Sequence, residues 1–191
     1  MNIKKYWLLL SAALLFCSTG SFQMSKTTSP YRCDNGKVTF KSEATLETIQ
    51  ARSNKLRGAV DPTNNTFAWS VDAISFDGFN SALQREHFNE NYIESSKFPK
   101  LTFTGKIIEK IDFQKDGRYT ARAKGKLVVH GVEQERIIRC ELEVLGDKIL
   151  VHAQFTVPLD DHNIRIPHIV NQKISEEVYL NIEAELRLTS S

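Results

Sequence analysis

The chain has 191 residues, 41% of them hydrophobic, with 25 Lys and Arg against 23 Asp and Glu. This length allows one domain with a sizeable core. Lysine and arginine form no cluster apart from acidic residues, so the electrostatic footprint of a nucleic-acid-binding protein is missing and we predict no nucleic-acid partner.

The N-terminus has the pattern of an export signal. Residues 2–5 are basic, and residues 6–17 form an apolar stretch that is too short to span a bilayer. We predict a signal peptide over residues 1–20 and a periplasmic or secreted protein. Loss of this segment removes two lysines and no acid, which leaves 23 basic residues against 23 acidic ones.

Lipidation of Cys17 is the competing interpretation of the same segment. A lipoprotein signal needs a small residue just before the cysteine, where this chain has the bulky Phe16. We therefore favour cleavage before Ser21 over anchoring through Cys17.

Cys33 and Cys140 remain in a chain bound for an oxidising compartment, where two cysteines are able to pair. In the other interpretation, Cys140 is a small core residue in register with Ile138 and Leu142, and Cys33 belongs to a flexible segment over residues 21–36. We favour the unpaired state, because sequence alone does not supply the Cα separation that a disulfide requires.

From Val38 onward, apolar and polar residues alternate with the period of two that is typical of strands with one buried face. Turn residues such as Gly146-Asp147, His130-Gly131, Asp116-Gly117 and the Asp61–Asn65 stretch separate the runs. The predicted strands cover residues 38–51 with a bend near 47, 56–60, 67–73, 101–107, 119–129, 138–144, 149–157 and 178–188.

One helix interrupts the strands. Asn80 or Ser81 is suited to cap a helix that runs through Tyr92, because the capping oxygen accepts a hydrogen bond from the first turn. Proline disfavours helical geometry in the residue before it, so Phe98-Pro99 ends any helix and period two resumes at Leu101.

Eight alternating strands joined by tight turns pair antiparallel, and their apolar face has to be buried against a second sheet or inside a closed barrel. A barrel of eight strands is wide enough to be filled by side chains or to hold one small ligand, and closure removes exposed edges. A sandwich fits the same alternation.

The runs REHFNENYIESSKFPKLTFTG (residues 85–105) and GRYTARAKGKLVVHGVEQ (residues 117–134) resemble the YceI-like family, bacterial secreted lipocalin-like proteins described as polyisoprenoid-binding. The resemblance spans residues 38–188. It implies an all-β fold: an eight-stranded antiparallel lipocalin-like barrel over residues 37–189, with a helix inserted between the third and fourth strands. It also implies a possible homodimer.

The inward positions of these strands are large and apolar, as a packed core requires in any case. The resemblance implies that they line a cavity for an isoprenoid or quinone-like lipid, and residues 76–92 then cover one mouth or merely plug it. The alternative is a non-binding structural or interaction protein with a packed barrel. The candidate lining residues are Phe40, Ile49, Phe67, Trp69, Val71, Phe76, Phe79, Leu83, Phe88, Phe103, Leu127, Val129, Ile138, Leu142, Val151, Phe155, Ile182 and Leu186.

Motifs for catalysis are missing: the chain has no Gly-x-Ser-x-Gly, His-Glu-x-x-His or Cys-x-x-Cys sequence. One polar group, Asp160, Asp161, His162 and His168 with His152, has the right residue types for a metal, but its spacing matches no ligand rule and Asp161–Asn163 suits a solvated turn. We predict a binding protein and not an enzyme, with no cofactor and no metal.

Overall fold

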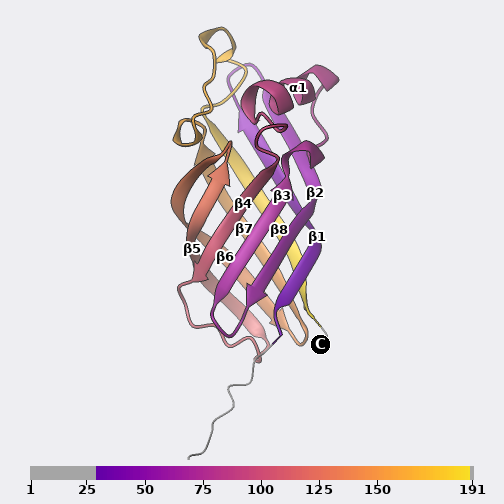
Figure 1. Ribbon diagram of the computed structural model, residues 1–191, viewed down its shortest axis with the longest axis vertical. Helices are drawn as coiled ribbons and strands as arrows, with labels where there is room; N and C mark the ends of the chain where they lie inside the picture. Colours follow the sequence, from indigo (N-terminus) through magenta and orange to yellow (C-terminus); the bar gives the residue numbers. More distant parts are fainter. Residues whose placement is uncertain (1–28, 190–191) are drawn as a thin grey trace, which may run out of the picture.

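The computed structural model describes residues 29–189. The predicted signal peptide, Cys17 and Ser21 lie outside the described residues. Eight antiparallel strands form a closed barrel, in which each strand pairs with the next and β8 pairs back to β1 (Figure 1). The predicted eight-stranded antiparallel barrel with a helix between the third and fourth strands is therefore confirmed. Within the described residues, no helix is long and apolar enough to cross a membrane.

The strands are β1 (Tyr31–Glu43), β2 (Thr48–Asp61), β3 (Thr66–Asp72), β4 (Lys100–Ile107), β5 (Gly117–Val129), β6 (Val132–Leu145), β7 (Lys148–Pro158) and β8 (Glu177–Leu188). Short helical turns lie between them: η1 (Ala73–Ser75), α1 (Ala82–His87), the π-helical turn η2 (Phe88–Tyr92), η3 (Asp160–His162) and η4 (His168–Val170). All of these turns lie at one end of the barrel, called here the upper end, and β8 ends at the lower end (Figure 1).

The first strand begins earlier than the sequence pattern indicated. β1 starts at Tyr31, so residues 31–36 of the segment predicted to be flexible belong to the barrel. Tyr31 and Cys33 are buried, each 4% exposed. The pairing of β1 with β2 shifts register on both sides of Gly36, and such a bulge breaks the alternation that reveals a strand in a sequence.

The prediction of one long strand over residues 38–51 is wrong. The chain reverses at residues 44–47, where the Ala44 amide donates to the Glu47 carbonyl over 3.0 Å and Glu43 pairs with Thr48. Residues 56–60, predicted as a separate strand, are the end of β2. This turn has the sequence Ala-Thr-Leu-Glu and carries none of the glycine, proline or asparagine residues that mark turns.

The predicted turn at His130-Gly131 is present. His130 has a φ of 50° and Gly131 a φ of 70°, the two positive values that a two-residue type I′ hairpin needs. In contrast, the chain does not reverse sharply at Asp116-Gly117, because residues 108–116 form a longer loop between β4 and β5. Phe113 of this loop is buried at the lower end of the barrel, where its carbonyl accepts a hydrogen bond of 3.3 Å from the Tyr31 hydroxyl.

The lower half of the barrel is packed with side chains. Its buried cluster includes Phe67, Leu142 and Leu186, together with Phe113 from the loop below. These residues come from the ends of β3, β6 and β8 that lie nearest the lower opening. The lower end is therefore closed by protein, and any internal site has to lie above this cluster.

Two glycines let β4 and β5 approach each other closely. Gly105 and Gly125 pair directly across the two strands. A Cβ atom on Gly125 would stand 2.3 Å from the Thr104 carbonyl oxygen, and one on Gly105 would stand 2.1 Å from the Lys124 carbonyl oxygen. Both atoms belong to the backbone, so neither moves without disturbing the strand pairing.

We expect Gly125→Ala to lower the free energy of unfolding by about 1–3 kcal/mol, the usual cost of forcing extra volume into a closely packed site. The control is Gly117→Ala, because the nearest atom to an added Cβ there is 3.6 Å away, an ordinary contact. This control should stay within about 0.5 kcal/mol of the parent. Urea unfolding measures both, and equal stability of the two variants would contradict the close approach.

Candidate functional site: an apolar cavity in the upper half of the barrel

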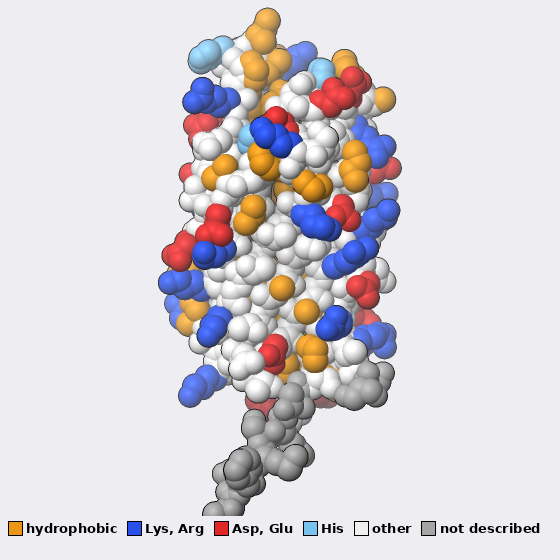
Figure 2. All heavy atoms as spheres, in the orientation of Figure 1, with side chains coloured by type: hydrophobic (Ala, Val, Ile, Leu, Met, Phe, Trp, Pro, Cys, Tyr) orange, Lys and Arg blue, Asp and Glu red, His pale blue; other side chains and the backbone are white. Residues whose placement is uncertain are grey.

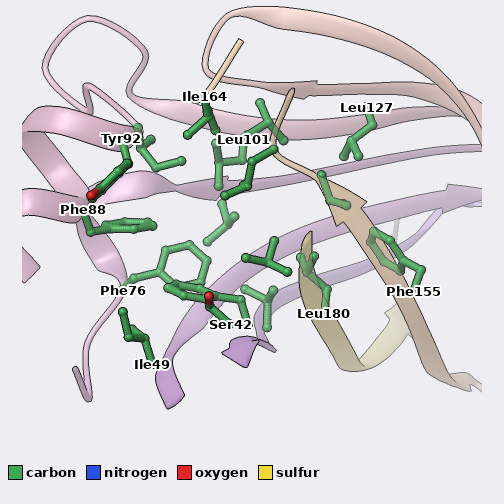
Figure 3. Close-up of a pocket in the computed structure, with 18 of the residues that line it drawn as sticks. Ser42, Ile49, Phe76, Phe88, Tyr92, Leu101, Leu127, Phe155, Ile164 and Leu180 are labelled. Atoms are coloured by element: carbon green, nitrogen blue, oxygen red, sulfur yellow. The ribbon is translucent and has the colours of Figure 1, made fainter. Parts of the chain in front are cut away.

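The upper half of the barrel encloses a cavity of about 480 Å³. Side chains from every strand face it, and Figure 3 shows Leu127, Phe155 and Leu180 on the walls with Phe76 and Phe88 at the covered end. Small-molecule sites in proteins have volumes of roughly 300–1,000 Å³, so this space is large enough for a ligand.

All but three of the predicted lining residues face this cavity. The exceptions, Phe67, Leu142 and Leu186, are buried in the lower cluster and do not line it. The prediction that these three side chains point into the barrel was correct. Alternation along a strand, however, does not indicate how far along the barrel axis a side chain lies. Contact of the remaining residues with a ligand stays a prediction.

One wall of the cavity was not predicted from the sequence. Leu159, Ile164, Ile166, Val170 and Ile174 line it from the loop of residues 159–176 between β7 and β8. Ile164 is buried and packs with Ala73 and Ile93 in a small cluster at the upper end. The spacing of Ile164 and Ile166, two apolar residues around Arg165, was a weak signal for this wall.

The sequence between β3 and β4 covers the upper end of the cavity, and we call residues 76–92 the cover. Ser81 caps α1 as predicted, since its Oγ accepts a hydrogen bond of 3.2 Å from the Gln84 amide. No residue of α1 is buried, so packing of this helix contributes little to holding the cover. The anchor has to come from the residues on either side of α1.

Four phenylalanines provide that anchor. The ring of Phe40 on β1 stacks on Phe88 with 5.4 Å between centroids and an interplanar angle of 15°. Phe76 and Phe79 lie 5.7 Å and 5.1 Å from Phe88. Aromatic pairs at these separations stabilise one another beyond the area that they bury. The cover is therefore attached to the barrel wall by its aromatic side chains, which also form the ceiling of the cavity.

Polar contacts hold both edges of the cover. On one edge, the Gln84 side-chain amide donates to Glu47 Oε1 over 2.5 Å, and the Asn80 amide donates to the Thr48 carbonyl over 2.9 Å. These bonds join the cover to the turn between β1 and β2.

On the other edge, Glu94, just beyond the cover, receives a hydrogen bond of 2.6 Å from His130 Nε2, while His130 Nδ1 lies 3.1 Å from the His162 carbonyl. Both partners of the His130 ring, the Glu94 carboxylate and the His162 carbonyl, are hydrogen-bond acceptors. The bond from His130 lowers the pKa of the Glu94 carboxyl below its ordinary value. His130 therefore links the end of the cover to the β5–β6 hairpin and to the loop of residues 159–176.

The polar group considered as a metal site does not come together. Within residues 29–189, no cluster of three His, Cys, Asp or Glu side chains is arranged to hold an ion. Asp161 pairs with Arg136 over 2.6 Å, and His162 is fully buried with its Nδ1 3.0 Å from the Val132 carbonyl. Burial lowers the pKa of His162, which favours the neutral ring of a structural residue.

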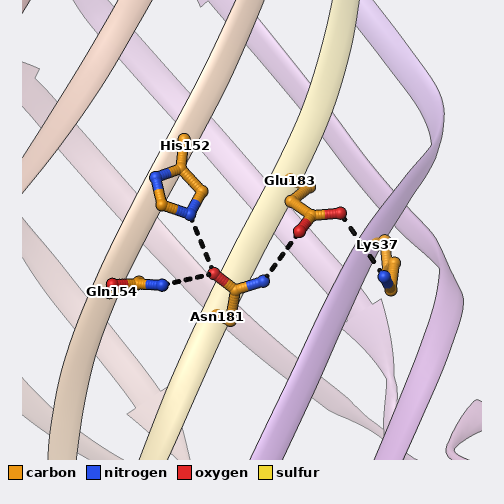
Figure 4. A network of polar contacts seen from close by, with 5 residues as sticks. All are labelled: Lys37, His152, Gln154, Asn181 and Glu183. Atoms are coloured by element: carbon orange, nitrogen blue, oxygen red, sulfur yellow. Dashed lines mark hydrogen bonds and ion pairs between the residues drawn. The ribbon is translucent and has the colours of Figure 1, made fainter.

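His152 has other partners, in a row of polar side chains on the barrel strands (Figure 4). Its Nε2 contacts Asn181 over 2.9 Å, Asn181 donates to Glu183 over 3.0 Å, and Glu183 pairs with Lys37 over 3.4 Å. This row crosses β7, β8 and β1, so it supports the seam where the barrel closes.

Cys33 and Cys140 are both free and buried. The interpretation of unpaired cysteines is therefore confirmed. Burial, with a smaller effect of Glu109, raises the pKa of the Cys140 thiol to about 11, which keeps it protonated and unreactive at neutral pH.

We expect Phe88→Ala to loosen the cover, because the variant loses the ring that contacts the other three phenylalanines. Phe88 is half-buried, so the loss should be about 1–2 kcal/mol, somewhat less than for a fully buried ring. Amide hydrogen exchange in residues 82–92 should become roughly tenfold faster, since about 1.4 kcal/mol corresponds to a factor of ten. Arg85→Ala, at an exposed position on α1, is the control and should leave exchange unchanged. An unaltered rate in Phe88→Ala would show that the aromatic contacts do not hold the cover.

A closed antiparallel barrel of eight strands with an apolar interior cavity belongs to the class of lipocalin-like barrels. The family model of the YceI-like domain matches residues 31–186 of this chain. The protein is thus a member of the YceI-like family.

Solved structures of the same fold come from several bacteria. A polyisoprenoid binding domain from Saccharophagus degradans, implicated in plant cell wall breakdown, superposes with a TM-score of 0.69 at 14% identity, over 85% of this chain and 99% of that one. BcnA of Burkholderia cenocepacia gives a TM-score of 0.65 at 14% identity, over 78% and 95% of the two chains. The YceI protein of Campylobacter jejuni gives 0.61 at 18% identity, over 78% and 90%.

At 14–18% identity, these likenesses show a shared fold. Among curated proteins, the comparison finds no match to this chain.

Proposed function

We propose that this protein is a periplasmic or secreted carrier that holds a long-chain lipid, an isoprenoid such as a prenyl lipid or a quinone, in the barrel cavity. The observation that carries the proposal is the cavity of about 480 Å³ with walls made chiefly of aliphatic and aromatic side chains. An apolar void left empty costs stability in proportion to its volume, whereas an apolar chain in it restores those contacts.

The wall chemistry favours a hydrocarbon chain over a polar ligand. Each buried methylene contributes about 0.8 kcal/mol, so about ten of them supply some 8 kcal/mol, the scale of micromolar binding before ordering costs. Binding of this kind needs no metal, covalent bond or charge on the ligand. The structure from Saccharophagus degradans, described as a polyisoprenoid binding domain, supports a branched isoprenoid chain as the ligand.

The polar side chains that line the cavity favour one orientation of such a ligand. Glu47, Gln84, His87 and Lys173 lie where the turn after β1, the cover and the loop of residues 159–176 meet. A lipid with its chain among Leu127, Phe155 and Leu180 would leave its head group beside these polar residues. The lower half of the barrel interior is filled by its buried cluster, so the polar residues at the mouth are the ones that a head group would meet.

We expect Ala153→Phe to displace the lipid while the barrel still folds, because Ala153 on β7 faces the cavity and the cavity has room for the ring. The matched control is Ala68→Phe on β3, which places the same ring at an exposed position. Native mass spectrometry of each protein purified from its own organism should show a bound lipid in the parent and in Ala68→Phe, and little or none in Ala153→Phe.

Urea unfolding of the same variants distinguishes the lipid carrier from the alternative, a non-binding protein with a packed barrel. In a solid interior, Ala153→Phe would overpack the core and cost about 1–3 kcal/mol. That loss, together with a parent protein that never carries or takes up a prenyl lipid or a quinone, would overturn the carrier proposal.

The proposed location rests on the short basic and apolar pattern of residues 1–20. N-terminal sequencing of the exported protein should give a start near Ser21. A mature protein that begins at a diacylated Cys17 would contradict this prediction and place the barrel at a membrane surface.

A further inference from the structure

Three segments surround the mouth of the cavity, and we call them together the rim: the turn of residues 44–47, helix α1, and the loop of residues 159–176. Each of them contributes lining residues, among them Glu47, Leu83 and Lys173. They also contact one another, since the Leu46 amide donates to the Gln172 carbonyl over 2.8 Å and Gln84 donates to Glu47. The rim is therefore one continuous surface around the opening.

Every segment of the rim holds a large apolar side chain out in solvent. Ile169 is 92% exposed, Leu46 is 65% exposed and Leu83 is 57% exposed. Figure 2 shows hydrophobic side chains at the uppermost tip of the molecule, beyond the barrel wall. A single exposed leucine or isoleucine is ordinary on a protein surface, but several around the mouth of an apolar cavity indicate a surface that is covered in use.

The charge of the stretch around Ile169, in the middle of this loop, indicates what covers it. Residues 164–174, Ile-Arg-Ile-Pro-His-Ile-Val-Asn-Gln-Lys-Ile, contain Arg165, His168 and Lys173 and no acidic residue. All three basic side chains are exposed, beside Ile169. The acids of the rim lie outside this stretch: Asp160, Asp161 and Glu176 at the two ends of the loop, Glu86 on α1 and Glu47 in the turn. Of these, Asp161 is paired with Arg136, and Glu47 accepts hydrogen bonds from Gln84 and Asn80. Exposed isoleucine next to lysine and arginine is the chemistry that enters the interface of a bilayer with anionic head groups.

We propose that the rim docks on the surface of a bilayer that contains anionic phospholipid, with Ile169, Leu46 and Leu83 inserted among the head groups. Docking in this orientation places the cavity mouth against the membrane. An apolar chain then passes between the bilayer and the cavity with little exposure to water. This transfer step rests on the proposed lipid-binding function, whereas the docking step rests on the rim alone.

The test is co-sedimentation of the purified exported protein with vesicles, made either of phosphatidylcholine or of phosphatidylcholine mixed with phosphatidylglycerol. We expect at least tenfold tighter binding to the anionic vesicles, weakened by salt because exposed charges are screened. Ile169→Asp should reduce that binding at least tenfold. The matched control is Ile137→Asp on the outer face of β6, where the isoleucine is 59% exposed but lies away from the rim, and it should bind as the parent does.

Three results would overturn the docking proposal. They are no binding of the parent protein to either vesicle, a loss of binding in Ile137→Asp as large as in Ile169→Asp, or full binding by Ile169→Asp. A lipid anchor at Cys17 would produce the last of these. Sedimentation velocity of the same samples identifies another occupant, because a dimer abolished by Ile169→Asp would assign the rim to a second copy of the chain. Ala153→Phe separates this proposal from the carrier function: it should lose the bound lipid and still dock.

Discussion

Closure of the barrel through the pairing of β8 with β1 is the constraint on which the rest of the structure depends. Lys37 to Lys41 of β1 pair with Glu183 to Tyr179 of β8. The polar side chains of His152, Asn181, Glu183 and Lys37 form a row of contacts across β7, β8 and β1. Once the sheet is closed, every second side chain has to point inward. The interior is then fixed by the number of strands, and the sequence decides only how much of it is filled.

The two halves of the interior are filled in different ways. Below, a loop brings Phe113 into the barrel against Tyr31, with ring centroids 6.2 Å apart, and the surrounding residues pack into one cluster. Above, the aromatic rings of the cover lie against Phe40 at the wall and leave the middle open. The cavity therefore exists because the cover is held by rings at its edge instead of by side chains that reach down the axis.

The strand alternation and the family resemblance predicted the barrel, capping chemistry predicted a helix start at Asn80 or Ser81, and all but three of the predicted lining residues face the cavity. The errors have local causes. The turn at residues 44–47 carries no turn residue, and the bulge at Gly36 conceals the start of β1. The wall from the loop of residues 159–176 was missed because loops have no period, and Phe67, Leu142 and Leu186 were placed on the wrong level because alternation fixes direction and not height.

The packed lower cluster makes the cavity blind-ended. The lining residues of β7 run from Val151 to Val157, which is about 20 Å of strand at 3.3 Å per residue. A chain that enters therefore meets a floor, and it leaves by the opening through which it came. Under the proposed function, a short chain would fit entirely inside the cavity, whereas a longer one would have to fold back on itself or extend out between α1 and the loop of residues 159–176. The depth of the cavity thus sets how long a part of such a molecule can be shielded from water.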